Sequence, residues 1–384
     1  MSYFVLPKTN GAISIRPIFT TTPMNDVICC SQSLHSFYYN IKQKIETICC
    51  NTDLNYEELI KSVNTYEYVF FKVPGSTHSV SKLTTLTTPL TNEFYNLIEL
   101  VSTHNVIDLV SCVVPITTLH MASTNADSFA CINLFRENNP FDKMLHQESL
   151  LSQTQNQHLY CKIDIMFFNQ MDQVQTLDEY ILYLVEIVLT VLEHQLQGGT
   201  SIIKIDYLFH APVVEIIYIL SHLFEKIYIN KPNTSNVATF EKYIVCKHFI
   251  VNETITQEHA LLAVKLKSLR TTAAAATTAA ATNLIPQQHI ASITESGIPL
   301  YFMHKINDIN IILGNQQLDA MNQIVCIVKN KQRDEKTEMT KKSSIQKAVS
   351  WCEKFKIPCN KFTEKTNIFL PFSKQKDEVY NTCG

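Results

Sequence analysis

The chain has 384 residues, of which 46% are hydrophobic and 17% charged, a balance that can fill the core of one large or two ordinary domains. Its net charge of −3 excludes a protein coated in positive charge, so a nucleic-acid partner would need a local basic patch. The 12 cysteines form no CxxC pair and show no ordered spacing with histidine, so a zinc site is unsupported.

The opening segment, MSYFVLPKTNGAIS, lacks the basic stretch and long apolar run of a secretory signal. Charged or polar residues interrupt the longest apolar stretches, so we expect no membrane span. Reduced cysteines in an intracellular compartment are the simplest interpretation.

The first 156 residues have mixed patterns. We assign residues 1–55 as a helical extension because SLHSFYYNIKQKIETI has the period of an amphipathic helix. NYEELIKSV predicts a second helix, and YEYVFFKVPGSTHSV predicts a strand that runs into a tight turn. NEFYNLIELVSTH predicts a helix, and the dense apolar run NVIDLVSCVVPI predicts a buried strand. Residues 122–156 are polar and irregular.

The pattern becomes clearer from residue 157. HLYCKIDIMFF predicts a strand, and TLDEYILYLVEIVLTVLEHQL predicts a long helix that Thr176 and Glu179 open as a capping box and Gly198-Gly199 ends. Next come a strand (TSIIKID), a helix (APVVEIIYILSHLF) and two strands (KIYIN and KYIVCKHF). Alternating strands and helices predict parallel crossovers in a three-layer α/β fold. The last two strands, with no helix between them, predict an antiparallel pair at the end of the sheet.

The remaining segments divide the chain into regions. TITQEHALLAVKLKSLR predicts a helix that closes an α/β domain over residues 56–270. The low-complexity run TTAAAATTAAAT, within 271–285, is interpreted as a linker or an exposed extension of that helix. Residues 286–384 are predicted to be a helical region in which KNKQRDEKTEMTKK is a solvated loop and SIQKAVSWCEKFKIP a helix.

One stretch of about fifty residues carries a family resemblance. GGTSIIKIDYLFHAPVVEIIYILSHLFEKIYINKPNTSNVATFEKYIVCKHF, residues 198–249, resembles the FtsJ/RrmJ-type RNA 2′-O-methyltransferases, above all the Adrift-type branch with members in large DNA viruses. WCEKFKIP resembles a C-terminal feature of the viral members more weakly. The resemblance implies a Rossmann-like sheet with helices on both faces, S-adenosylmethionine as cofactor and capped RNA as substrate. It also implies viral capping or transcription proteins as partners, and a location in the host cytoplasm or nucleus, or in the virion.

In this family four residues, in the order Lys-Asp-Lys-Glu, transfer the methyl group to a ribose 2′-hydroxyl. A hydroxyl is a poor nucleophile at neutral pH, so a positioned base must take its proton. The resemblance assigns Lys204 as the central lysine, Glu241 as the glutamate and Asp164 as the acid at the end of the fourth strand. The first lysine is assigned to Lys61, on the helix before the first strand, with Lys44 as the alternative.

Each of these residues also has a plain structural interpretation. Lys204 could be a surface lysine at a strand end, Glu241 a solvent-facing strand residue, and Asp164 an acid without a chemical role. The sequence also departs from the family pattern, because Ile165 and Met166 follow Asp164 where relatives have glycines.

The resemblance places the cofactor loop at KVPGSTHS, so Pro74, Gly75, Ser76 and Thr77 are assigned to cofactor binding together with Asp164. Relatives have P-G-G-F there. Glycines let the backbone turn tightly and approach a ligand, and Ser76 adds a Cβ at that point.

The loop between the last two strands is expected to face RNA, with Lys231, Ser235 and Asn236 as contacts. Asn236 replaces the family's arginine and Phe240 its serine. Two functions therefore stay open: an active RNA 2′-O-methyltransferase, or a catalytically inactive methyltransferase fold that serves as an RNA-binding or scaffold subunit. A structural protein without a site is a third reading.

Overall fold

The computed structural model of the chain describes residues 2–9, 13–23, 27–52, 55–83, 90–107, 114–122, 126–146, 162–169, 174, 176–206, 208–251, 253–281, 288–329 and 334–360. They belong to two compact units, residues 1–64 with 85–331 and residues 65–84 with 332–384. Within the described ranges, no helix is both long and apolar enough to span a bilayer.

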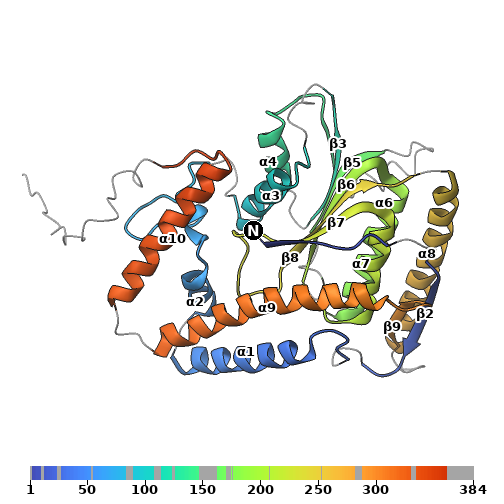
Figure 1. Cartoon of the computed structure of the whole chain (residues 1–384), viewed down its shortest axis with the longest axis horizontal. Helices are drawn as coiled ribbons and strands as arrows, with labels where there is room; N and C mark the ends of the chain where they lie inside the picture. Colours follow the sequence, from blue (N-terminus) through green and yellow to red (C-terminus); the bar gives the residue numbers. More distant parts are fainter. Residues whose placement is uncertain are drawn as a thin grey trace, which may run out of the picture. The chain divides into compact units, whose positions relative to one another are not determined.

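The larger unit is built on a seven-stranded sheet in the order β1-β7-β8-β6-β5-β3-β4 (Figure 1). Its strands are β1 (Ser2–Val5), β3 (Thr117–Ala122), β4 (Lys143–His146), β5 (Ile163–Asn169), β6 (Gln195–Ile205), β7 (Phe224–Lys231) and β8 (Lys242–Phe249). β4, β3, β5 and β6 pair in parallel, whereas β8 is antiparallel to both β6 and β7. This confirms the predicted α/β sheet and its antiparallel strand.

Helices cover both faces of the sheet (Figure 1). On one face α3 (Asn92–Thr103) packs against α4 (Ala126–Phe135), and on the other α6 (Leu177–His194) packs against α7 (Ala211–Leu223). The apolar faces of α6 and α7 are buried on the strands, and the core includes Val185, Ile216 and Ile203, each at most 1% exposed. Burial of such side chains stabilises the fold by about 2 kcal/mol each.

The predicted capping box of α6 is present. Thr176 Oγ1 accepts a hydrogen bond from Glu179 N at 3.3 Å, and the Glu179 carboxylate accepts one from Thr176 N at 3.2 Å. The helix ends at His194, however, and the glycine pair lies inside β6. A Cβ on Gly199 would lie 2.8 Å from Leu196 O and 2.9 Å from Asp164 O, so only glycine fits there.

A second, two-stranded sheet pairs β2 (Ile15–Thr20) with β9 (His289–Thr294). The described part of the unit also contains α1 (Gln32–Thr52), α2 (Tyr56–Val63), α8 (Glu253–Ala281) and α9 (Leu300–Lys329). α8 packs on α6 and includes the alanine-rich segment up to Ala281, which therefore continues the helix. Both α1 and α2 pack against α9.

The N-terminal half differs most from expectation. β1 extends the sheet edge by antiparallel pairing with β7, within a region that was expected to be helical. The first strand of the central region is β3, at 117–122, and half of the predicted strand in NVIDLVSCVVPI, residues 108–113, lies outside the described residues. Short strands that are completed by distant partners leave little signal in local periodicity.

The smaller unit contains the 3-10 helix η1 (Glu67–Val69) and α10 (Asp334–Lys354), which pack together. The predicted strand in YEYVFF is wrong, because Phe70 N and Phe71 N donate back to Glu67 O at 3.3 and 2.8 Å and close local turns. The predicted solvated loop is partly wrong as well, because α10 begins at Asp334 inside the charged run.

Candidate active site

The carboxyl ends of the parallel strands bring two polar side chains together. Phe168 of β5 is in register with Ile203 of β6, so the following residues, Asn169 and Lys204, lie side by side at the strand ends. Open α/β sheets bind ligands at this edge. The geometry therefore indicates a candidate site that contains Lys204 and Asn169.

Lys204 forms an ion pair with Glu241. Its Nζ lies 3.9 Å from Glu241 Oε1, and the two side chains are 18% and 14% exposed. Lys204 is paired across the sheet with Tyr243, and Glu241 precedes that residue by two positions. The structure thus brings together the two residues that the resemblance assigned as central lysine and glutamate.

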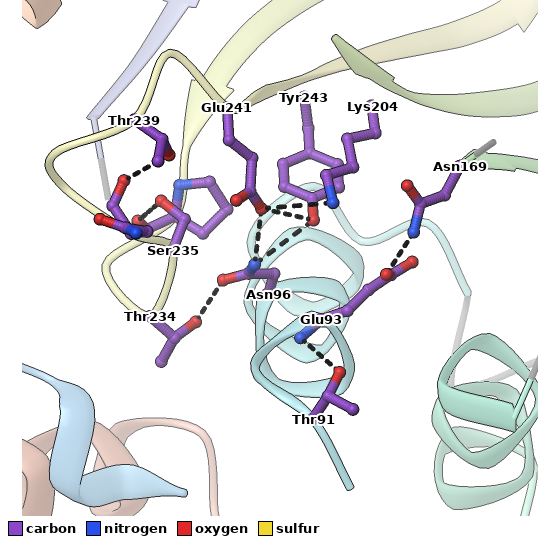
Figure 2. A network of polar contacts seen from close by, with 12 residues as sticks. Thr91, Glu93, Asn96, Asn169, Lys204, Thr234, Ser235, Thr239, Glu241 and Tyr243 are labelled. Atoms are coloured by element: carbon purple, nitrogen blue, oxygen red, sulfur yellow. Dashed lines mark hydrogen bonds and ion pairs between the residues drawn. The ribbon is translucent and has the colours of Figure 1, made fainter. Parts of the chain in front are cut away.

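Two neutral side chains, Asn96 and Tyr243, bind Glu241, and Thr234 binds Asn96 in turn (Figure 2). The amide of Asn96, on α3, donates to Glu241 Oε1 and to Tyr243 Oη, both at 3.3 Å. Tyr243 donates to the same carboxylate oxygen at 3.1 Å, and Thr234 donates to Asn96 Oδ1 at 2.7 Å. Burial raises the pKa of Tyr243 well above its usual value, and the carboxylates of Glu241 and Glu93 add to this. Tyr243 therefore stays a hydrogen-bond donor.

Glu93 completes the cluster from the first turn of α3 (Figure 2). Thr91 caps this helix by accepting a hydrogen bond from Glu93 N at 3.2 Å, which fixes the backbone of Glu93. The side-chain amide of Asn169 donates to Glu93 Oε2. Burial raises the pKa of Glu93 to about 7, and the charge of Lys204 and the bond from Asn169 oppose the rise. Such a carboxyl can exchange a proton near neutral pH.

Lys231 organises the loop that precedes Glu241. Its Nζ donates to the carbonyl oxygens of Asn236, Thr239 and Glu241 at 2.7, 3.1 and 2.5 Å. Burial lowers its pKa to about 8. The ammonium group therefore binds the backbone of its own loop, whereas the sequence predicted that it would contact RNA phosphate.

Ser235 and Asn236 also turn inward. Ser235 is 1% exposed and donates to Pro232 O at 2.7 Å, and the side chain of Asn236 accepts from Ala238 N at 2.9 Å. Phe240 packs against Tyr38 and Phe209, with ring centroids 4.3 and 5.1 Å apart. The internal contacts satisfy polar groups of the loop, and it needs no glycine because none of residues 232–241 has a positive φ.

Asp164 lies at the amino end of β5, at the opposite end of the parallel strands from Lys204. It is the second residue of β5, and its carboxylate accepts a hydrogen bond from Thr117 N, at the start of β3, at 2.8 Å. Asn169, at the far end of the same strand, is the residue beside Lys204. The assignment of Asp164 to the catalytic group and to the cofactor is corrected here, because parallel strands present their carboxyl ends, not their amino ends, to the site.

Lys61 lies on α2, whose apolar residues Leu59 and Ile60 pack into a cluster with Met321 of α9. Its alternative, Lys44, lies on α1. The helix that directly precedes the first parallel strand is α3, so the position sought for the first lysine belongs to the first turn of α3. Glu93 stands there, a residue that the sequence reasoning missed.

Pro74, Gly75, Ser76 and Thr77 belong to the smaller unit, whereas all seven strands belong to the larger one. They form a turn in which Ser76 N donates to Val73 O at 2.9 Å, and Gly75 has φ +82°. The expected cofactor loop is therefore misplaced, because a cofactor loop of this fold follows the first parallel strand. In the sequence that connection, from Ala122 to Ala126, reads ASTNA and contains no glycine.

The sequence contains a signal for both Asn169 and Glu93. Asn169 is the first polar residue after the apolar run IMFF, which is where a parallel strand presents its end. Glu93 lies in a helix that was predicted correctly, but a search for a lysine passes over an acid.

Comparison with known proteins agrees with the fold. Residues 98–249 match the family model described as FtsJ-like methyltransferase, so less than half of the chain is similar to that family. The matched segment contains Asn169, Lys204 and Glu241 but neither Glu93 nor the turn at Pro74. No curated protein matches.

Among solved structures, the human methyltransferase-like protein 13 in complex with SAH matches at 9% sequence identity, over 45% of this chain and 92% of that chain. The TM-score is 0.25, and a likeness at this level does not bear on fold or function here.

The family match indicates S-adenosylmethionine as the cofactor. Its methionine end carries a sulfonium, an ammonium and a carboxylate group and is positive overall, so a fitting site offers acceptors and negative charge to the two cationic groups. The side-chain oxygen Oδ1 of Asn169 is buried and has no hydrogen-bond partner among the described residues, and the carboxyl groups of Glu93 and Glu241 flank Lys204. This set fits the cationic end of the cofactor.

Proposed function

We propose that the chain is an RNA 2′-O-methyltransferase that modifies the cap-proximal ribose of viral mRNA. The observation that supports this most is the Lys204–Glu241 ion pair at the carboxyl end of β6, inside the segment that matches the FtsJ-like family model. When bound, S-adenosylmethionine would supply an electrophilic methyl group. The protein's own part is to hold the ribose hydroxyl and to take up its proton.

On this proposal Lys204 binds the hydroxyl oxygen. An ammonium group offers three donors, and Glu241 at 3.9 Å keeps it at the strand end. Asn96 and Tyr243 fix Glu241 in turn, so Lys204 is positioned before the substrate arrives. Preorganised charges of this kind cost no reorganisation during the reaction. Viral capping or transcription proteins and an intracellular location in the infected host, or in the virion, belong to the same proposal.

A second function is favoured by a different observation. Asn169 and Glu93 stand where the family pattern has an acid and a lysine, and the connection after β3 has no glycine. These features favour a methyltransferase fold that binds RNA, or serves as a scaffold, without transferring a methyl group.

One experiment separates the two. Purified chain is incubated with tritium-labelled S-adenosylmethionine and capped RNA that carries either a hydroxyl or a hydrogen at the first 2′ position. The enzyme labels the first RNA and not the second, whereas the scaffold labels neither. Lys204→Ala should lose the labelling, and Lys226→Ala, at an exposed lysine of β7, is the matched control that keeps it.

A further inference from the structure

We propose that Glu93 is the proton acceptor of this site and that Lys204 stays charged throughout. The inference rests on the proposed function and assigns a step of it. The O–H bond of the ribose breaks, and its electron pair forms the bond to the methyl carbon. The methyl–sulfur bond breaks with its electron pair left on sulfur. The proton passes to the carboxylate of Glu93, which becomes a neutral carboxylic acid.

The geometry gives Glu93 a fixed and accessible position. Thr91 caps α3 at Glu93 N, and the Thr91 backbone and hydroxyl are themselves held by the carboxylate of Asp127 at 3.2 and 2.5 Å. Asn169 engages only Oε2 of Glu93, and the residue is half-buried. The carboxyl group is therefore anchored at one oxygen and can still meet a substrate.

Charged and titratable groups from each neighbouring element face Glu93. Asp127 on α4 and Glu241 in the loop before β8 disfavour a negative charge on Glu93, and Lys204 on β6 favours it. The Tyr243 hydroxyl on β8 stays neutral because burial and the carboxylates of Glu241 and Glu93 raise its pKa. The positive charge of Lys204 also interacts with Glu241, so it offsets only part of the negative charge of Glu93. Burial adds the largest effect, and the pKa of about 7 that results suits a base at neutral pH.

Asn169 is matched to this role. A carboxylate in its place would face the Glu93 carboxylate and repel it, whereas an amide donates a hydrogen bond to the charged form. The side chains of Asn169 and Glu93 thus form one unit that holds a single exchangeable proton. The reaction needs an acceptor but no second lysine.

The test compares the wild type with Glu93→Gln, which keeps an oxygen that can accept from Asn169, and with Glu58→Gln, at an exposed glutamate of α2, as the matched control. Single-turnover methyl transfer to capped RNA is measured from pH 5 to 9. The wild-type rate should rise through about pH 7 and level off. Glu93→Gln should lose that rise and about 100-fold or more in rate, while Glu58→Gln matches the wild type.

Two further measurements keep the outcome unambiguous. Carbon-13 NMR of labelled glutamate carboxyls should show one group that titrates near pH 7 in the wild type and is missing in Glu93→Gln. Calorimetric titration gives the affinity of each variant for S-adenosylmethionine, and the rates are compared at saturating cofactor, so that weaker cofactor binding by Glu93→Gln is not counted as a loss of the proton acceptor. A variant that keeps the wild-type rate and its pH dependence overturns the role of Glu93 alone. Absence of transfer by the wild type overturns the proposed function and this inference together.

Discussion

The side-chain amide of Asn169 donates a hydrogen bond to the carboxyl of Glu93, and this contact joins the end of β5 to the first turn of α3. It lies beside the Lys204–Glu241 ion pair, so one cation stands among two carboxyl groups and an amide. The predictions that follow test this arrangement.

Lys204→Ala should reduce methyl transfer to capped RNA about 100-fold or more, because the ribose hydroxyl loses the donor that positions it. Cofactor affinity should change little, since the positive charge of Lys204 does not attract a cationic ligand. Label transfer and calorimetric titration measure the two effects separately. Retained transfer would remove Lys204 from the mechanism.

Glu93→Gln should change how stability depends on pH. The pKa of Glu93 is about 7 in the folded protein and 4.5 in an ordinary glutamate, so between these values the folded state keeps a proton that the unfolded chain has lost. Stability that is fully present below pH 4.5 is therefore lost as the pH rises through 7. At pH 8 the variant should exceed the wild type by up to about 3 kcal/mol.

Urea unfolding at pH 4.5 and pH 8 checks this linkage. The two proteins should be equally stable at the lower pH and differ only at the higher one. A constant difference at both pH values would indicate a packing effect, not a titration.

Lys231→Met should destabilise the protein by about 3 kcal/mol, because the carbonyl oxygens of Asn236, Thr239 and Glu241 lose their donor. Hydrogen exchange should rise in residues 232–241 and little elsewhere. If Lys231 instead served phosphate, the variant would fold with normal stability and bind RNA with a smaller salt dependence. Lys226→Ala is the matched control.

Gly199→Ala should destabilise the fold by several kcal/mol, because the added Cβ would approach two backbone oxygens closer than 3.0 Å. Gly297→Ala is a useful comparison, since Gly297 has φ +66° and open space around it, and strain alone should cost about 1 kcal/mol. Thermal unfolding ranks the two variants. A loss at Gly199 no larger than that at Gly297 would show that the neighbouring atoms move aside for the added Cβ.

The second half of the sheet could be read from the sequence because its signals are local. The strands from β5 to β8 each contain a short apolar segment, and α6 and α7 between them have buried apolar faces. Lys204 and Glu241 could be placed because they occur in a motif at fixed distances from those strands. Their meeting across the sheet follows from the register of Lys204 with Tyr243.

The first half could not be read in this way. β3 is six residues long and is fixed by its neighbours β4 and β5, so the sequence alone favoured other segments as the first strand. The assignments of the cofactor loop to Pro74 and of the first lysine to Lys61 depend on where the first strand lies, so they are wrong for the same reason. The error at Asp164 has a different cause. The resemblance assigned it to the end of a strand, but that strand begins at Ile163 and continues past Asp164 to Asn169.

The measurement that tests the central claim most directly is mass spectrometry of the first transcribed nucleotide in capped RNA after incubation with the wild-type chain and S-adenosylmethionine. The account predicts a gain of one methyl group on the ribose, lost when the first nucleotide is 2′-deoxy and lost in Lys204→Ala. An unmodified ribose with a chain that is folded and binds the cofactor would contradict it.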